Sequence, residues 1–234
     1  MRKSKLLMIL LGLTVSIKSF ATPATDLLEK IKKTYPNIPF TQVLETPVAG
    51  IYEANFGKEI LYVDSTGTYF FPTIVNMMTK QNLGEDRRAE LNKVAFSDLP
   101  LKDAFKTVNG NGSRELVVFA DPNCSYCKRL EQVLANTKDT TIYTFSVGIL
   151  GEDSTKKVNA IACTDGDKAK AWKSYMLEGK PVTEKTCADS PAARNLALFQ
   201  KLGFQGTPGI VFKNGAVVKG FVEAPKLEEM LAKK

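Results

Sequence analysis

Apolar and polar residues follow different periods in different parts of the chain, and these periods predict its elements. In residues 24–35 the apolar side chains recur at helical spacing, which predicts a short amphipathic helix. Runs rich in aromatic and β-branched residues follow and predict strands at 40–44, 51–56, 60–64 and 69–71. We therefore expect a small helix-plus-sheet module at residues 22–82. A unit of roughly 60 residues buries little apolar surface and often needs association to be stable.

Residues 83–94 contain good helix formers but almost no apolar stripe. A helix that is polar nearly all round either bridges two domains through solvent or is an ordinary surface helix, and this stretch alone does not decide between the two. The glycine-rich segment 109–113 predicts a flexible joint or loop. We therefore expect a linker region at residues 83–107 and a further domain at residues 108–234.

The last part of the chain alternates strand and helix patterns in a β-α-β order, which is typical of α/β proteins. Leu116–Ala120 is wholly apolar, as expected of a central strand buried on both faces. A second strand is expected near 141–147, and an Asn-Gly turn predicts a hairpin of 209–213 with 216–222. Helices are expected at 153–164, 167–178, 191–202 and 225–233. The first three form an inserted lobe at about 150–203, with Trp172 as a core side chain.

Two cysteines stand where the apolar run ends, in the order Cys124-Ser125-Tyr126-Cys127. Apolar residues recur at helical spacing from Cys127 onward, so both sulfurs are expected in the first turn of a helix. Cys124 comes first, and we expect it at the exposed tip. Asp121 or Asn123 is expected to cap this helix.

The start of a helix has a chemical consequence for these thiols. Unpaired backbone N–H groups and the helix dipole concentrate positive potential there, which favours a thiolate over a thiol. Lys128 and Arg129 add positive charge. Because the thiolate is the species that attacks a disulfide, Cys124 is the expected nucleophile. Cys127, on the inward side of the same turn, is the expected resolving thiol.

The sequence contains no histidine. This excludes Ser-His and Cys-His nucleophile systems and every metal site that needs histidine. Thiol exchange remains possible, because local potential ionises its nucleophile without a general base. A four-cysteine zinc site is the remaining metal option, but Cys163 and Cys187 lack the second close spacing that such sites usually have. We expect no metal and no cofactor.

The first 21 residues have the pattern of a secretory signal peptide. Three cations precede an apolar stretch at residues 6–17, and Ser19-Phe20-Ala21 gives a small-x-small cleavage site. The apolar stretch is too short for a stable membrane span, so no stable membrane insertion is expected. Removal of residues 1–21 leaves 28 cations and 25 acids, a net charge of +3. Because no basic stripe with interleaved aromatic residues remains, nucleic acid is not an expected partner.

Four cysteines in an exported protein indicate disulfides before metals. Three pairings are possible, and we favour a redox pair of Cys124 with Cys127 and a structural pair of Cys163 with Cys187. The second pair closes a loop of 23 intervening residues. Loop-closure entropy makes such a bridge worth roughly 3 to 4 kcal/mol.

The ordered set of motifs resembles a known family. Phe119–Lys128 after a strand, a helical insertion, and Gly206–Gly209 opening a hairpin look like the catalytic domain of a thioredoxin fold. Together with Pro47–Gly50, the linker helix and the second cysteine pair, the chain resembles the DsbC/DsbG family of periplasmic disulfide isomerases. The resemblance implies a thioredoxin-like catalytic domain with a helical lobe, preceded by a small α+β dimerisation domain and a linker helix.

The resemblance also implies site residues and partners. Thr207-Pro208 corresponds to the family's cis-proline element, where the Thr207 backbone and Tyr126 contact an extended substrate. The N-terminal modules of two chains are expected to form a homodimer with an apolar cleft for misfolded exported proteins. Aromatic residues of the module are candidates for its core or that cleft: Tyr52, Phe56, Tyr62, Phe70 and Phe71. The expected reductant is an inner-membrane thiol donor of the DsbD type.

We therefore expect a periplasmic thiol-disulfide isomerase that reshuffles or reduces wrong disulfides through a mixed disulfide at Cys124. A dithiol oxidase, or a reductase dedicated to one partner, is the alternative within the same chemistry. A third interpretation is a holdase chaperone in which Cys124 and Cys127 stay permanently bridged. In that case replacing Cys124 with Ser would leave all activity intact.

Overall fold

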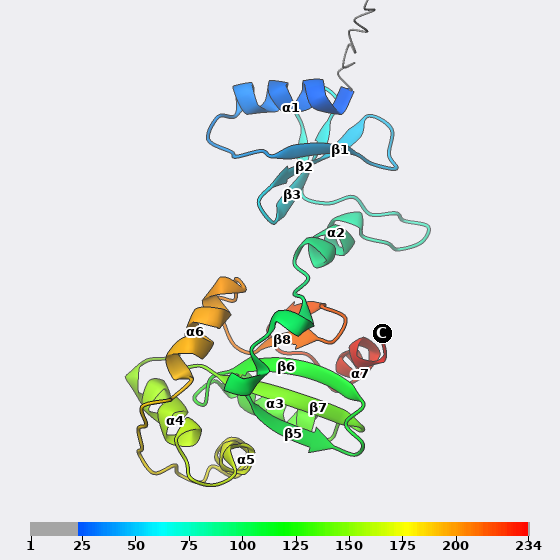
Figure 1. Ribbon diagram of the computed structural model, residues 1–234. Helices are drawn as coiled ribbons and strands as arrows, with labels where there is room; N and C mark the ends of the chain where they lie inside the picture. Colours follow the sequence, from blue (N-terminus) through cyan, green and yellow to red (C-terminus); the bar gives the residue numbers. More distant parts are fainter. Residues whose placement is uncertain (1–22, 234) are drawn as a thin grey trace, which may run out of the picture. The chain divides into compact units, whose positions relative to one another are not determined.

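The computed structural model describes residues 23–233, which form two compact units divided between Glu85 and Asp86 (Figure 1). The expected signal peptide at residues 1–21 lies outside the described residues. Within residues 23–233, no helix combines the length and the apolar character that a membrane crossing requires.

The first unit is a helix packed on a small antiparallel sheet, as the sequence predicts. Helix α1 (Pro23–Thr34) buries Leu27 and Ile31 against the sheet. The strands pair in sequence order and are β1 (Gln42–Glu45), β2 (Ile51–Phe56), β3 (Glu59–Asp64) and β4 (Phe70–Phe71). Phe40, Val43 and Ala54 complete the core beneath α1. Of the aromatic candidates, Tyr62 is buried, Phe71 is exposed, and the other three, Tyr52, Phe56 and Phe70, pack partly buried against this core.

The polar stretch after the first sheet forms helix α2 (Leu83–Leu91), three residues shorter than expected. Two single 3₁₀ turns follow it, η1 (Phe96–Asp98) and η2 (Leu101–Asp103). Phe96 and Leu99 are buried in the core of the second unit. The chain between α2 and the next sheet therefore contributes apolar residues to the second unit's core.

The second unit contains a five-stranded sheet in the order β5-β7-β6-β8-β9. Its strands are β5 (Phe105–Asn109), β6 (Arg114–Ala120), β7 (Thr140–Ser146), β8 (Gly209–Phe212) and β9 (Val217–Lys219). β6 and β7 are parallel, and the other pairs are antiparallel. Strand β5 is absent from the sequence expectation, because its half-polar residues carry a weak strand signal. It pairs along its whole length with β7 at the edge of the sheet.

Strand β6 is buried on both faces, which confirms the prediction from its apolar run. Leu116 and Val118 belong to a core that also contains residues of α3 (Ser125–Ala135), α5 (Lys168–Glu178) and α7 (Ala224–Ala232). Val117 and Phe119 point to the opposite face, where Phe119 packs against Phe199 and Phe204. The strand therefore fixes the position of its C-terminal end, where the two cysteines follow.

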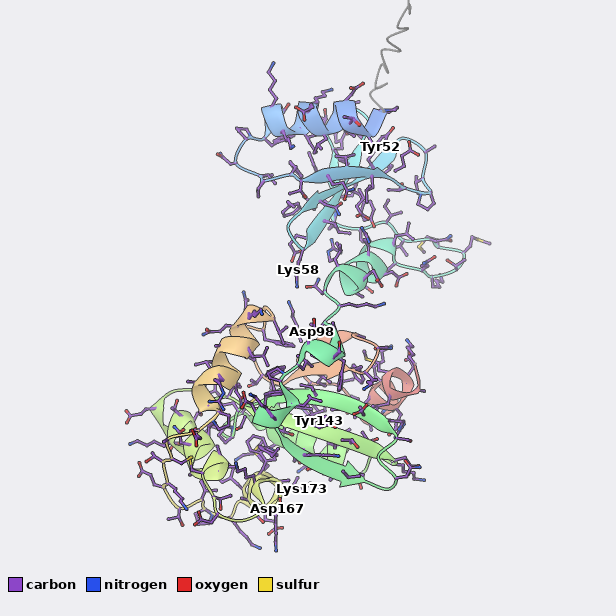
Figure 2. The ribbon with its side chains drawn as sticks, viewed as in Figure 1. Tyr52, Lys58, Asp98, Tyr143, Asp167 and Lys173 are labelled. Carbon is purple, nitrogen blue, oxygen red and sulfur yellow. A yellow bond between two sulfur atoms is a disulfide. The ribbon has the colours of Figure 1, made fainter. Side chains whose placement is uncertain are left out.

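Three helices form the inserted lobe between β7 and β8, namely α4 (Glu152–Ala162), α5 and α6 (Ala192–Lys201). Figure 1 shows them gathered on one side of the second unit, away from α7. Asp167, labelled in Figure 2, caps α5 by accepting a hydrogen bond from the Lys170 backbone N–H at 3.1 Å. Trp172 on the same helix is buried as expected, and its indole N–H donates to Glu131 at 3.0 Å.

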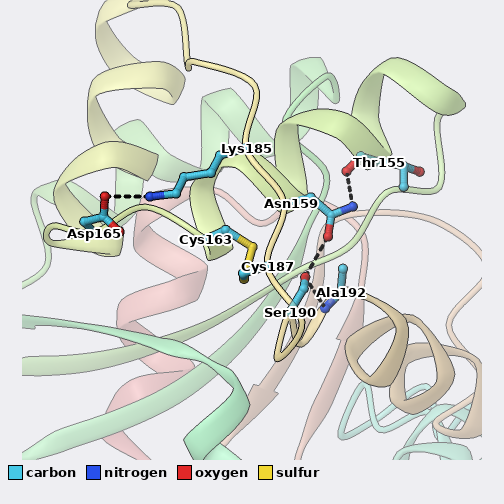
Figure 3. The surroundings of a disulfide bond; sticks show 8 residues. All are labelled: Thr155, Asn159, Cys163, Asp165, Lys185, Cys187, Ser190 and Ala192. Atoms are coloured by element: carbon cyan, nitrogen blue, oxygen red, sulfur yellow. Dashed lines mark hydrogen bonds and ion pairs between the residues drawn. A yellow bond between two sulfur atoms is a disulfide. The ribbon is translucent and has the colours of Figure 1, made fainter.

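A disulfide joins Cys163 at the end of α4 to Cys187 in the segment between α5 and α6 (Figure 3). This segment has no regular secondary structure. Two further contacts cross the same region, a hydrogen bond from Ser190 to Asn159 at 2.6 Å and an ion pair between Lys185 and Asp165. The disulfide therefore ties an irregular segment to α4.

Candidate active site

The two remaining cysteines lie at the start of α3, and both carry free thiols. Cys124 is the N-cap residue and Cys127 lies in the first turn. The Lys128 backbone N–H donates to the Cys124 carbonyl at 3.1 Å, which is the first bond of the helix. The two cysteines are therefore one helical turn apart at the N-terminal end of α3, where the helix dipole favours negative charge.

Cys124 is not at an exposed tip, contrary to the sequence expectation. Its side chain is only 8% exposed, and its Sγ donates a hydrogen bond to the Thr207 carbonyl at 3.3 Å. Thr207 lies in the loop before β8, and no local pattern around Cys124 predicts this long-range contact. The next two residues, Ser125 and Tyr126, are exposed, and the Tyr126 residue is 53% exposed.

Neither Asp121 nor Asn123 caps α3, so that expectation is wrong. The Asp121 carboxylate is buried and accepts hydrogen bonds from the backbone N–H groups of Asn123, Ile149 and Leu150. It also accepts from the Ser154 hydroxyl at 2.8 Å. Asp121 therefore joins the turn before Cys124 to the start of the inserted lobe instead of to the helix.

The Thr207-Pro208 peptide bond is cis. Gly209 follows it and pairs with Phe119 as β8 runs antiparallel to β6, which brings the loop beside the start of α3. A Cβ at Gly209 would lie 2.6 Å from the Phe204 ring, so only glycine fits there. The Pro208 carbonyl accepts from the Gly220 N–H at 2.8 Å, which holds the loop against the hairpin.

The two thiols lie in different environments. Burial raises the pKa of the Cys127 thiol, and a hydrogen bond with Thr207 opposes part of this effect. Cys124 is nearer the surface and is followed by the exposed Tyr126. The arrangement allows one thiol to react with another molecule while the second stays protonated behind it.

An aromatic and basic surface adjoins Cys124, in which the fold adds Phe221 to Tyr126 and Arg129, the two residues that the sequence indicates. The Arg129 guanidinium lies 4.5 Å from the Phe221 ring centroid and 5.7 Å from that of Tyr126. Phe221 comes from the end of the hairpin, more than 90 residues along the chain, and no local pattern connects it with the cysteines. Arg129 also forms an exposed ion pair with Glu223. Within residues 23–233, no group of three or more Cys, Asp or Glu side chains is placed to hold a metal ion.

Two family models match the chain. One, described as a disulfide bond isomerase protein N-terminal domain, matches residues 18–85. The other, described as a thioredoxin-like domain, matches residues 101–234. Together they cover both units of the structure, and the second match includes the cysteine pair and the cis-proline loop.

Named relatives agree with these matches. A probable thiol:disulfide interchange protein DsbC of Bordetella parapertussis is 38% identical over 204 residues, covering 87% of this chain and 72% of the relative. The DsbC of Escherichia coli K12 is 27% identical over 207 residues, covering 83% of this chain and 82% of that protein. A crystal structure of a disulfide interchange protein from Neisseria gonorrhoeae superimposes with a TM-score of 0.55 at 40% identity, covering 58% of this chain and 97% of that one. The chain belongs to the DsbC family and is a thiol:disulfide interchange protein, an oxidoreductase with a thioredoxin-like domain.

Proposed function

We propose that this chain reshuffles wrong disulfides in exported proteins of the periplasm, with Cys124 as the nucleophile. The observation that carries the proposal is the place of Cys124 at the start of α3, with its Sγ 3.3 Å from the carbonyl of Thr207 in the cis-proline loop. The helix start favours the thiolate, and the loop offers backbone groups beside it for an extended client.

In the proposed reaction the Cys124 thiolate attacks one sulfur of a client disulfide. A bond forms between the two sulfurs, and the other client sulfur leaves as a thiolate. A different client thiolate then attacks the client sulfur of the mixed disulfide, forms a new client disulfide and releases Cys124 as a thiolate. No net electrons are transferred, so this route is isomerisation.

Cys127 provides the alternative route, which is reduction. Its thiolate attacks Cys124 Sγ, releases the client as a thiol and leaves a disulfide between Cys124 and Cys127. Because burial raises the pKa of Cys127, little of its thiolate is present at neutral pH, and this step is slow. The mixed disulfide then lives long enough for a second client thiol to attack it, which favours isomerisation over reduction. We propose that an inner-membrane thiol donor of the DsbD type returns the two electrons after each reduction.

We propose that clients bind at the exposed Tyr126 ring and along the backbone of Thr207 and Pro208. Because backbone pairing and an aromatic surface discriminate little between sequences, recognition is broad. Misfolded proteins, which expose apolar side chains and extended segments, are the expected clients. The Cys163–Cys187 disulfide is proposed to be structural.

We also propose a division of labour along the chain. Residues 22–82 pair two chains into a homodimer, residues 83–107 form the linker, and residues 108–234 carry catalysis with the insertion at about 150–203. Residues 1–21 are removed on export. The match of residues 18–85 to an isomerase N-terminal domain supports the first assignment.

Reactivation of scrambled ribonuclease tests the proposal against oxidation of reduced ribonuclease. The reduced protein should restore activity to the scrambled enzyme, and Cys124→Ser should abolish this. Cys127→Ala should retain part of the reshuffling and accumulate mixed disulfides, whose partners mass spectrometry identifies.

The rival functions give different results in the same assays. Strong oxidation of reduced ribonuclease without reshuffling indicates a dithiol oxidase. Full activity of Cys124→Ser in preventing aggregation, with no exchange in the parent protein, indicates a holdase and rejects the proposed reaction.

A further inference from the structure

Tyr175 links the inserted lobe to the cysteine turn. It lies on α5, 51 residues beyond Cys124 in the sequence, and belongs to the buried core that also contains Cys124 and Cys127. Its hydroxyl donates to Asn123 Oδ1 at 3.1 Å, and Asn123 directly precedes Cys124. A side chain of the insertion is therefore in contact with the segment that carries the nucleophile.

The Tyr175 ring also binds two ammonium groups. The Lys128 Nζ lies 5.2 Å and the Lys157 Nζ 5.4 Å from the ring centroid, both within the range of a cation–π interaction. Lys157 is neutralised by Asp153, with 2.5 Å between nitrogen and oxygen. Among the ion pairs of residues 23–233, none includes Lys128, whose side chain is half-buried. The ring therefore holds one cation that no carboxylate neutralises.

Lys128 is placed to act on Cys124. The two residues are one helical turn apart on the same face of α3, since the Lys128 N–H donates to the Cys124 carbonyl at 3.1 Å. The Cys124 Sγ donates a hydrogen bond to the Thr207 carbonyl and also lies within hydrogen-bonding reach of the Cys127 thiol. A thiolate cannot make the first of these bonds. The thiolate needs positive charge from elsewhere, and the helix amides and Lys128 can supply it.

The other charged and titratable groups around the turn are already paired. The Asp121 carboxylate accepts four hydrogen bonds, and Cys127 is a buried thiol. On α3 itself, Arg129 is paired with Glu223 at 3.4 Å. On α4, Asp153 and Lys157 neutralise each other. Lys128 is therefore the cation closest along α3 to the nucleophile that no carboxylate neutralises, while Asp121 is a negative charge held by neutral donors.

The side-chain amide of Asn123 also connects the cysteine turn to the inserted lobe. Its Nδ2 donates to Asp153 at 2.7 Å and to Ser154 at 2.9 Å. Its Oδ1 accepts from Lys157 at 2.8 Å and from Tyr175 at 3.1 Å. All four hydrogen-bonding positions of the amide are thus used by α4 and α5.

We propose that Tyr175 is a positioning residue of the inserted lobe, whose ring holds the ammonium of Lys128, a residue one helical turn from Cys124, and thereby sets the thiolate fraction of the nucleophile. The proposal rests on the proposed role of Cys124. It gives the insertion a function in catalysis, because the nucleophile depends on a side chain from α5 for its charge environment.

The test is the pH dependence of Cys124 alkylation in the full-length reduced protein, with mass spectrometry reporting the modified residue. Lys128→Gln should lower the rate at pH 6 roughly 3- to 10-fold relative to the high-pH plateau. Tyr175→Leu should lower it in the same direction by a smaller factor. In the Lys128→Gln background, Tyr175→Leu should add nothing. Lys170→Gln, which removes an exposed charge elsewhere on α5, is the matched control and should leave the profile unchanged.

A second set of variants preserves the packing of the buried ring. Tyr175→Phe removes only the hydroxyl and should keep most of the thiolate, while a pentafluorinated phenylalanine at 175 reverses the charge of the ring face and should reproduce the Tyr175→Leu profile. An unchanged profile with the fluorinated ring overturns the proposal. An equal effect of Tyr175→Leu with and without Lys128 also overturns it.

Failure of this inference is distinguishable from failure of the proposed function. If the parent Cys124 alkylates like a free thiol, with a midpoint near about pH 8.5, the nucleophile itself is wrongly assigned. If the parent midpoint is low and only the Tyr175 variants fail to move it, the nucleophile stands and the positioning role is rejected.

Discussion

Asp121→Asn is a small change that should strongly destabilise the second unit. Oδ1 of Asp121 accepts from the Asn123 N–H and the Ser154 hydroxyl, both at 2.8 Å. Oδ2 accepts from the N–H groups of Ile149 at 2.8 Å and Leu150 at 3.0 Å. An asparagine has one acceptor oxygen and one NH₂ group. With the NH₂ group toward Ile149 and Leu150, two backbone N–H groups face another donor. In the reverse orientation the Asn123 N–H faces a donor, while the Ser154 hydroxyl can rotate to accept.

The cost follows from the backbone N–H groups, one or two of them, that lose their acceptor. A hydrogen bond to a charged group contributes about 1.5 to 3 kcal/mol, and a buried donor without a partner costs about 1 to 3 kcal/mol. Removing a buried charge offsets part of this loss. We expect the free energy of unfolding to fall by about 2 to 5 kcal/mol, a large fraction of the roughly 5 to 15 kcal/mol of a typical domain.

Urea unfolding followed by tryptophan fluorescence measures this, because Trp172 is the one tryptophan and lies in the core of the second unit. Asp165→Asn is the matched control. Asp165 is 93% exposed in its side chain and forms a surface ion pair with Lys185, so its loss should change stability by less than about 0.5 kcal/mol. If the free energy of unfolding of Asp121→Asn lies within about 1 kcal/mol of that of the parent protein, the four hydrogen bonds of Asp121 do not stabilise the unit as argued.

Two further predictions concern stability. Replacing both Cys163 and Cys187 with Ser should lower the free energy of unfolding by roughly 3 to 4 kcal/mol through loop entropy, and a urea midpoint unchanged from the parent would contradict this. Burial raises the pKa of Glu131, so the folded state keeps its proton to higher pH than the unfolded state does, and stability falls as pH rises through that window. Glu131→Gln retains an acceptor for the Trp172 N–H. The difference between its thermal midpoint and that of the parent should shift in favour of the variant as pH rises from 4 to 8. A constant difference across that range would reject the buried carboxyl as the cause.

Local periodicity is sufficient for most of the elements. The apolar run of β6 predicts a strand buried on both faces. The structure confirms this, since each face of β6 meets a separate core. The helical spacing after Cys127 predicts α3, since a buried face and the position of the turn are both local properties of the sequence. The polar character of β5 explains why that strand is not predicted: its edge position requires no continuous apolar run.

The site is less predictable, because its geometry depends on long-range contacts. Asp121 looks like a helix cap by its position, but its carboxylate turns to the backbone of residues 149 and 150, which only the fold brings near. The burial of Cys124 depends on Thr207, which lies 83 residues further along the chain. No local period encodes such a contact; the expectation that Thr207-Pro208 lies near the cysteines comes from the resemblance of this motif to the family's cis-proline element.

The inserted lobe matters for the chemistry because its helices α4 and α5 contact the turn that carries Cys124. The β6–β8 pairing brings the cis-proline loop to one side of Cys124, where the Thr207 carbonyl accepts a hydrogen bond from the thiol. On the side of the lobe, α4 and α5 form hydrogen bonds with Asn123, and the Tyr175 ring lies under Lys128. A thioredoxin-like sheet with α3 alone would retain both cysteines and the loop, yet it would lack the groups that hold Lys128. We therefore expect the sequence of the lobe to contribute to the reactivity of Cys124.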